Sequence, residues 1–214
     1  MGSGSRDSAA RMPAEWGMRL ILASQSRYRL ALLHQAGVDA EPLPAHVDEA
    51  EVKASARADG LSADEAALLL AALKAERVAH RHPDALVIGA DQLLVCEGQW
   101  FDKPADLDAA RAQLRALRGR AHVLVTAVVC QRGGHRVWQH VARPRLTMRD
   151  FSGAFLAQYV ALEGDVLTTT VGAYRVEGPG LQLFDAIEGE HAAIIGLPLL
   201  PLLGFLRQHG VLLR

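Results

Sequence analysis

The stretch from Leu86 to Pro104, LVIGADQLLVCEGQWFDKP, limits the folds open to this chain more than any other segment. Two apolar runs flank Asp91, and a glycine-containing turn at residues 97–99 separates them from a short returning segment. This pattern predicts a β-hairpin. A carboxylate inside an apolar strand is costly to bury unless a cation or hydrogen-bond donors contact it. We therefore expect Asp91 either to accept from backbone N–H groups or to bind a cation, with Lys103 returning towards it.

Composition excludes two classes of partner. The chain has 214 residues, half of them hydrophobic, with a formal net charge of -1. That length suffices for one large core, or for two lobes that share a sheet. A nearly neutral chain gains little from nucleic acid or an anionic membrane, so we expect neither as a partner. No apolar run reaches about 18 residues, so no membrane span is predicted.

Cys96 and Cys130 both lie in apolar, strand-like runs. We expect buried free thiols, which fits the reducing environment of the cytoplasm. Residues 1–17, MGSGSRDSAARMPAEWG, lack the apolar centre of a signal peptide and are rich in Gly, Ser, Ala and Arg. We interpret them as a disordered leader that precedes one domain at 18–214.

Helical and strand patterns alternate along the chain without internal repeats. The sequence predicts a hairpin at 86–104, strands at 19–23, 121–131, 136–148 and 181–187, and helices at 28–36, 58–81, 107–117, 151–163 and 199–208. Pro144 lies in one predicted strand and is compatible only with an edge or a bulge. The alternation predicts an α/β fold with a mixed sheet.

Polar side chains with chemical potential recur at loops and strand ends. They are Ser24, Ser26 and Arg29 before a helix, Asp48 and Glu49 at the start of another, Lys74 on an apolar helix face, Asp91 with Lys103, and Glu177 in the glycine-rich bend 171–180. The serines are either a plain helix cap or part of a phosphate site at a helix N-terminus. Carboxylates with Lys and Arg, but without His-rich spacing, favour an oxygen-bound cation such as Mg²⁺ over zinc.

These segments, taken in order, resemble the Maf family of nucleoside triphosphate pyrophosphatases. The resemblance runs from Leu20 to Val211. It rests on LILASQSRYRLALL (20–33), VDE (47–49), LKA (73–75), IGADQ (88–92), DKP (102–104), GRAHVLVTAV (119–128), VGAYRVEGPG (171–180) and IIGLPL (194–199). Each motif is weak alone, but all of them in this order are specific.

The resemblance implies an elongated mixed-sheet α/β fold with a nucleotide cleft between two lobes. It implies dependence on Mg²⁺ or Mn²⁺, release of pyrophosphate from a nucleoside triphosphate, and a cytoplasmic house-cleaning role, and it leaves a homodimer open. The implied site has Asp91 as catalytic acid/base, Glu49 and Asp91 as metal ligands, Lys74, Lys103 and Arg29 as phosphate contacts, and Ser24 and Ser26 in the first loop.

The chain departs from the family pattern at one place. Members usually carry Pro and two consecutive arginines after the serine that matches Ser26, whereas this chain has Arg27-Tyr28-Arg29-Leu30. Leu30 replaces the second arginine. Either Arg27 substitutes for it from the other side, or phosphate binding is weaker.

Base preference and the rival functions follow from the same comparison. Tyr28, Gln92 and Glu177 match the selectivity positions of the family's 7-methyl-GTP branch, so a guanine-type triphosphate is expected over dTTP or UTP. The alternative is that Tyr28 packs in the core and Glu177 only caps the bend. A non-catalytic nucleotide-binding regulator of cell division is the rival function, and the retained Asp91 and lysines favour an enzyme.

Overall fold

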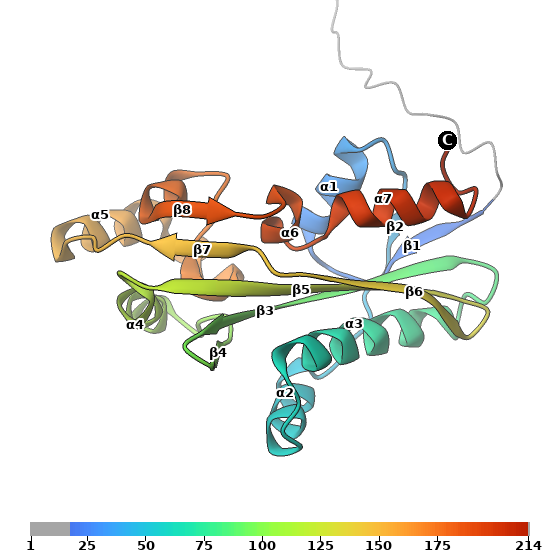
Figure 1. Ribbon diagram of the computed structural model, residues 1–214, viewed down its shortest axis with the longest axis horizontal. Coiled ribbons are helices and arrows are strands. Elements are labelled where there is room, and N and C mark those ends of the chain that lie inside the picture. The colour runs from blue at the N-terminus through green and yellow to red at the C-terminus, as the bar shows by residue number, and fades with distance from the viewer. Residues whose placement is uncertain (1–17, 214) are drawn as a thin grey trace, which may run out of the picture.

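Residues 18–213 are described by a computed structural model, and they form one open sheet of eight strands flanked by helices (Figure 1). The strand order is β2-β1-β3-β5-β7-β8, with β4 paired to β3 and β6 paired to β5. The strands are β1 Leu20–Leu22, β2 Glu41–Pro42, β3 Leu86–Cys96, β4 Gln99–Phe101, β5 Ala121–Arg132, β6 His135–Ala142, β7 Arg145–Met148 and β8 Phe184–Glu188. The predicted leader at 1–17 lies outside the described residues.

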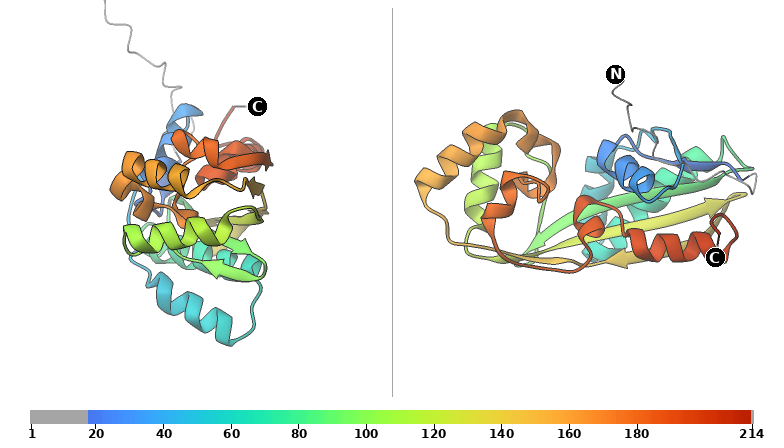
Figure 2. Two further views of the ribbon diagram at one scale, coloured as in Figure 1. Left: turned by 90° about the vertical axis from the view of Figure 1, so that its left-hand side faces the viewer. Right: turned by 90° about the horizontal axis from the view of Figure 1, so that it is seen from above.

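Parallel and antiparallel pairs share this sheet, which confirms the predicted mixed α/β class. Strand β1 runs parallel to β2 and β3, and the other pairs are antiparallel. Strands β3 and β5 pair from Val87↔Gln131 to Val95↔Val123. This long ribbon extends along most of the molecule and carries both ends of it (Figures 1 and 2).

Seven α-helices and three short 3₁₀ segments complete residues 18–213. They are α1 Arg27–Gln35, α2 Glu49–Ala58, α3 Ala63–Ala79, α4 Leu107–Leu117, α5 Gly153–Glu163, α6 His191–Ile195 and α7 Leu199–Gln208, with 3₁₀ turns at Gly164–Thr169, Val171–Ala173 and Pro179–Leu183. The bounds of α4 and α7 are those predicted from the sequence. None of these helices is both long enough and apolar enough for a membrane crossing.

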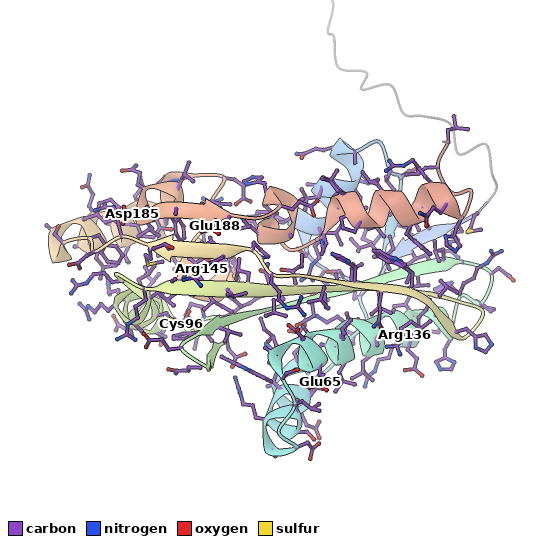
Figure 3. The ribbon with its side chains drawn as sticks, viewed as in Figure 1. Glu65, Cys96, Arg136, Arg145, Asp185 and Glu188 are labelled. Carbon is purple, nitrogen blue, oxygen red and sulfur yellow. The ribbon has the colours of Figure 1, made fainter. Side chains whose placement is uncertain are left out.

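Three apolar clusters hold the helices on the sheet. One packs α3 against the sheet, and another packs α1 and α7 against it at the same end of the molecule. The third fills the opposite end, beneath α4, α5 and the 3₁₀ segments. Seen from above, the two ends form separate groups of helices joined by the ribbon (Figure 2). Cys96 (Figure 3) and Cys130 are buried and free within the described residues, as expected.

The helix predicted at 58–81 is wrong at its start. The chain leaves α2 at Ala58, turns through Gly60 at a φ of 69°, and begins α3 at Ala63. Ser62 and Glu65 (Figure 3) form the capping box that starts α3. The capping signal was in the sequence, and a cap belongs before the first helical residue, so it should have outweighed the apolar periodicity.

Two predicted strands also need correction. The strand predicted at 136–148 is divided at residues 143–144, because Pro144 has no N–H to donate, and its halves β6 and β7 pair with different parts of β5. The strand predicted at 181–187 begins only at Phe184. A 3₁₀ turn that starts at Pro179 occupies the residues before it.

A glycine in β3 allows α3 to lie directly on the sheet. A Cβ atom on Gly89 would lie 2.1 Å from the carbonyl oxygen of Ala71 and 2.8 Å from the nitrogen of Ala75. Both atoms belong to the α3 backbone, which cannot move aside as a side chain can. Gly89 therefore sets the distance between α3 and β3, and with it the distance between the side chains that these elements carry.

We predict that Gly89→Ala lowers the free energy of unfolding by about 1–3 kcal/mol, because the methyl group overpacks this contact. Gly204→Ala is the matched control, since a Cβ on Gly204 in α7 meets nothing within 4 Å. That change should raise stability by up to about 1 kcal/mol through helix propensity. Urea unfolding followed by circular dichroism measures both. Equal stability of the two variants would contradict the assigned role of Gly89.

Candidate active site

The edge of β3 is open where the polar residues lie. Strand β1 pairs with β3 only as far as Ile88, and β4 begins to pair at Leu94. Strand β5 occupies the other edge throughout. Among the described residues, no strand covers the free edge from residue 89 to 93. Side chains from both faces of this segment can therefore reach one cleft, although neighbouring residues of a strand point to opposite faces.

Asp91 and Glu49 meet at a lysine ammonium in this gap. Asp91 is 2% exposed, and its Oδ1 accepts a 2.6 Å hydrogen bond from Lys74 Nζ on α3. Glu49 Oε1 lies 2.6 Å from the same nitrogen. Of the two kinds of partner expected for Asp91, backbone N–H groups or a cation, the structure shows a cation, the Lys74 ammonium. Lys74 reaches the cleft and does not extend to solvent.

The neighbouring ammonium groups change the pKa of Glu49. Burial acts to raise the pKa of this carboxyl, but the Lys74 ammonium, with Lys53 and Lys103 further away, outweighs it, and the pKa lies below its ordinary value. Glu49 is therefore a carboxylate at neutral pH. It occupies the first position of α2, where Asp48 is the N-cap and accepts from the backbone N–H of Glu51. Asp48 thus caps the helix, and Glu49 provides a carboxylate to the cleft.

A divalent cation fits the oxygen atoms that are available. Asp91 Oδ2 is buried and has no hydrogen-bond partner among the described residues, and Glu49 lies across the same ammonium. Residues 18–213 contain no group of three or more His, Cys, Asp or Glu side chains that could hold a metal ion. Two carboxylates with substrate and water oxygens are the usual Mg²⁺ ligands, so Glu49 and Asp91 would hold the ion only together with a bound phosphate.

The strand-to-helix junction forms the opposite wall of the cleft. Ser26 is the N-cap of α1, and Ser24 Oγ accepts from the Ser26 backbone N–H at 3.1 Å. Arg29 donates from Nε to the Gly196 carbonyl oxygen at 2.7 Å and from Nη1 to Ser24 Oγ at 3.4 Å. Burial lowers the pKa of Arg29, while the carboxylates of Asp91 and Glu49 act in the other direction. Ser26 thus caps the helix, and both serines line the larger cavity.

Two adjoining cavities, of about 640 and 390 Å³, share these walls. The larger is lined by four cations, Arg27, Arg29, Lys74 and Lys103, against one carboxylate, Glu49. The smaller also contains Asp91 and Gln92. Lys103 itself is exposed, but the cavity mouth desolvates its ammonium enough to lower its pKa, against the pull of Glu49. Such a cationic, ligand-sized cleft suits a polyanion.

The three expected selectivity residues lie around one smaller pocket. Tyr28, Gln92 and Glu177 line a space of about 40 Å³ that opens beside the 390 Å³ cavity. Tyr28 is half-buried and lines all three spaces, so it does not pack in the core. Glu177 is exposed in the bend. A space of this size is too small for a purine, but Tyr28 and Gln92 also line the adjoining 390 Å³ cavity.

Hydrogen bonds fix the direction of the Gln92 amide. Its Nε2 lies 2.8 Å from Thr126 Oγ1 and 3.0 Å from the carbonyl oxygens of Ala193 and Ile194. Carbonyl oxygens only accept, so the NH₂ side must face them. Thr126 pairs with Gln92 across β3 and β5 and donates to the Ala193 oxygen at 2.9 Å. The oxygen of Gln92 is the end left for a ligand.

Comparison with known proteins identifies the family of this chain. A family model described as Maf-like protein matches residues 19–209. The chain belongs to the Maf-like protein family. The resemblance found in the sequence is thereby confirmed.

Several relatives of this Maf-like chain align over nearly their full length. A nucleoside triphosphate pyrophosphatase of Granulibacter bethesdensis is 62% identical over 195 residues, which cover 91% of this chain and 99% of the relative. One from Rhodospirillum rubrum is 54% identical, covering 91% and 96%. A 7-methyl-GTP pyrophosphatase of Brucella abortus is 44% identical, covering 89% and 96%.

The departure from the Maf-like motif has a structural counterpart. Leu30 packs against the apolar cluster of α1 and α7, so it contributes to the core. Arg27 lies at the first position of α1 and lines the larger cavity. Its guanidinium carbon stands 5.0 Å from the centre of the Tyr28 ring, and Nη2 donates to the Tyr28 hydroxyl at 3.1 Å. That Arg27 replaces the missing arginine stays a prediction.

Sequence reasoning missed three polar residues of this region: Lys53, Asp102 and Thr126. Lys53 Nζ donates to Asp102 Oδ1 at 2.8 Å, and both residues line the 390 Å³ cavity. The sequence signal for Lys53 was its position four residues after Glu49 in α2. Thr126 gave no signal, because a threonine inside an apolar strand is common and its partner Gln92 is distant in sequence.

We predict that Lys74→Met lowers the free energy of unfolding by about 3–5 kcal/mol, because it leaves the buried Asp91 carboxylate without a counter-ion. Lys74→Met/Asp91→Asn should lose less, since neither buried charge remains. Arg19→Met is the control, as its partner Glu41 and Arg19 itself are exposed, and we expect a change of about 1 kcal/mol or less. Urea unfolding distinguishes the three variants. A double variant with a lower free energy of unfolding than Lys74→Met would refute the pairing of Lys74 with Asp91.

Proposed function

We propose that this protein hydrolyses a nucleoside triphosphate to a nucleoside monophosphate and pyrophosphate. The observation that carries the proposal is the single cleft in which buried Asp91 and half-buried Glu49 face Lys74, Lys103 and Arg29. The names of the relatives from Granulibacter bethesdensis and Rhodospirillum rubrum support it. A water oxygen forms a bond to the α-phosphorus, the bond to the bridging oxygen breaks, and pyrophosphate leaves.

Asp91 is the group that receives the proton of the attacking water. Its Oδ1 is held by Lys74, and its Oδ2 has no partner among the described residues. Asp91 also lines the 390 Å³ cavity, and a carboxylate fixed at a cavity wall can orient a water and accept its proton. The Lys74 ammonium thus positions Asp91 through its contact with Oδ1.

The cationic side chains stabilise charge on the triphosphate. Lys103, Lys74 and Arg29 converge on the same cavity from three different elements. Positive groups preorganised where charge develops act strongly in a partly dry site. Glu49 and Asp91 would hold Mg²⁺ or Mn²⁺, which neutralises phosphate charge and polarises the α-phosphorus when bound. The carboxylates and the cations thus divide binding and activation between them.

We further propose that the base is guanine, preferably methylated at N7. The fixed Gln92 amide offers an oxygen and Glu177 offers a carboxylate, so two of the residues that line the pocket can accept hydrogen bonds. The N1–H and N2–H₂ edge of guanine supplies two donors, whereas uracil or thymine supplies one N–H between two carbonyls. A cationic 7-methylguanine also gains from stacking on Tyr28, about 0.5–2 kcal/mol. The name of the Brucella abortus relative agrees with this preference.

We predict that the purified protein with Mg²⁺ releases pyrophosphate from a triphosphate, and that Asp91→Asn and Glu49→Gln lose about 100-fold or more in kcat, as for other electrostatic groups in active sites. Glu51→Gln is the matched control, because Glu51 also lies in the first turn of α2 but is exposed and lines neither cavity. A coupled assay for pyrophosphate measures this. Binding of a triphosphate without turnover by the wild type would identify a sensor instead.

For the base, we predict a higher kcat/KM for 7-methyl-GTP than for GTP, and for GTP than for dTTP or UTP. Glu177→Gln should reduce these ratios by replacing the carboxylate with an amide. Glu188→Gln should leave them unchanged, since Glu188 (Figure 3) lies on β8 and lines none of the cavities described above. Competition between two triphosphates in one reaction gives the ratios. A preference for UTP or dTTP would contradict the assigned base.

A further inference from the structure

We propose that Lys53 is a positioning residue of this active site, which fixes Glu49 on one side of the cleft and Lys103 on the other by holding Asp102. The inference rests on the proposed pyrophosphatase function. It concerns Lys53, which lies in none of the sequence motifs, and Asp102, to which the DKP motif gives no role.

Lys53 is buried in a way that stability alone explains poorly. Its side chain is 9% exposed, and Nζ donates to Asp102 Oδ1 at 2.8 Å. Desolvating an ammonium is costly, and because its partner Asp102 is 51% exposed, the ion pair adds little stability to offset that cost. Lys53 also lines the 390 Å³ cavity together with Glu49, Asp91 and Lys103. A buried lysine at the wall of a reactive cleft therefore indicates a functional reason for its retention.

The ion pair joins the two segments that supply the site. Lys53 lies four residues after Glu49 on α2, so the two side chains are on the same face of the helix. Asp102 immediately precedes Lys103. Gln113 of α4 holds the same segment by donating from Nε2 to the Asp102 carbonyl oxygen at 2.6 Å. A shift of Asp102 relative to α2 would thus move Lys103 away from Glu49.

Helix α2 has few other anchors. It projects from the body of the molecule beyond α3, as two perpendicular views show (Figures 1 and 2). Its buried residues are Lys53 and Ala56. A helix with so small an apolar contact relies on polar contacts for its orientation. These are the contact of Glu49 with Lys74 and that of Lys53 with Asp102. Because Glu49 is the first residue of α2, the direction of the helix decides where that carboxylate lies.

The pair also has an electrostatic effect on the cleft. Burial acts to raise the pKa of Asp102, but the hydrogen bond and charge of Lys53, with a smaller effect of Arg57, keep the pKa below its ordinary value. Asp102 is therefore negative and lines the cavity that receives a polyanion. The Lys53 ammonium neutralises it there. Without Lys53, the cavity wall would carry an unbalanced negative charge beside the phosphate.

Arg57 provides a matched control on the same carboxylate. Its Nη2 lies 3.4 Å from Asp102 Oδ2, and its side chain is 43% exposed. It also packs over the Trp100 ring, outside the cavities that contain Glu49. Arg57→Met therefore removes a positive charge near Asp102 but leaves the buried link intact.

The test is a double-mutant cycle with steady-state kinetics on Lys53→Met, Asp102→Asn and Lys53→Met/Asp102→Asn, with Arg57→Met as the control. We expect kcat of Lys53→Met to fall about tenfold or more, as misplaced catalytic groups cause, with its thermal midpoint equal to or above that of the wild type. We expect KM to rise in Lys53→Met, because the charge of Asp102 is then unbalanced. The double variant restores charge balance, so its KM returns towards the wild-type value, but its kcat stays as low as in either single variant. Arg57→Met keeps kcat within twofold of the wild type.

Three results would overturn the inference: kcat of Lys53→Met within twofold of the wild type, independent effects of Lys53 and Asp102 that multiply in the double variant, or an equal loss in Arg57→Met. If Lys53→Met does not fold, Asp102→Asn alone decides, because it removes the same link at an exposed position. Absence of turnover in the wild type with every triphosphate would instead refute the proposed function.

Discussion

The contact of the Lys74 ammonium with Asp91 and Glu49 is the interaction on which the site depends. Lys74 is carried by α3, Asp91 by β3 and Glu49 by α2, so this one nitrogen joins three elements. It can do so because Gly89 admits the α3 backbone against the strand. The contact is important because β3 has a free edge at this point, so a cleft can open onto the buried carboxylate of Asp91.

This arrangement exchanges stability for reactivity. A buried pair of charges contributes little net stability compared with apolar packing of the same volume. The three apolar clusters, one under α3, one under α1 and α7 and one under α4 and α5, provide that packing around the cleft. On β3, Asp91 and Gln92 stand between Ala90 of one cluster and Leu93 of another. The strand ribbon β3–β5 keeps them in register, and the other polar groups of the cleft come from loops and helices.

The sequence predicted the parts of this structure that local physics determines. The helix cap at Ser26, the hairpin after Asp91 and the bounds of α4 and α7 follow from side-chain patterns within a few residues. The motif set also contains the residues that the fold brings to the two adjoining cavities, from Ser24 to Lys103, while Glu177 lines the smaller pocket beside them. The error at 58–81 arose because apolar periodicity hid a turn that Gly60 and Ser62 marked.

What the sequence could not predict depends on pairs that are distant along the chain. The link between Lys53 and Asp102 joins residues 49 positions apart. The amide direction of Gln92 depends on carbonyl oxygens about 100 positions away. The free edge of β3 exists because β1 is short and β4 starts late, a property of strand pairing and of no single segment. Each of these features depends on tertiary contacts and not on a local sequence pattern.

The position of water attack tests the account most directly. Hydrolysis of the triphosphate in ¹⁸O-enriched water, followed by mass spectrometry of both products, shows which phosphorus receives the new oxygen. Attack at the α-phosphorus, oriented by Asp91, predicts label in the nucleoside monophosphate and none in the pyrophosphate. Label in pyrophosphate, or release of orthophosphate as the first product, would contradict the assigned geometry of the cleft.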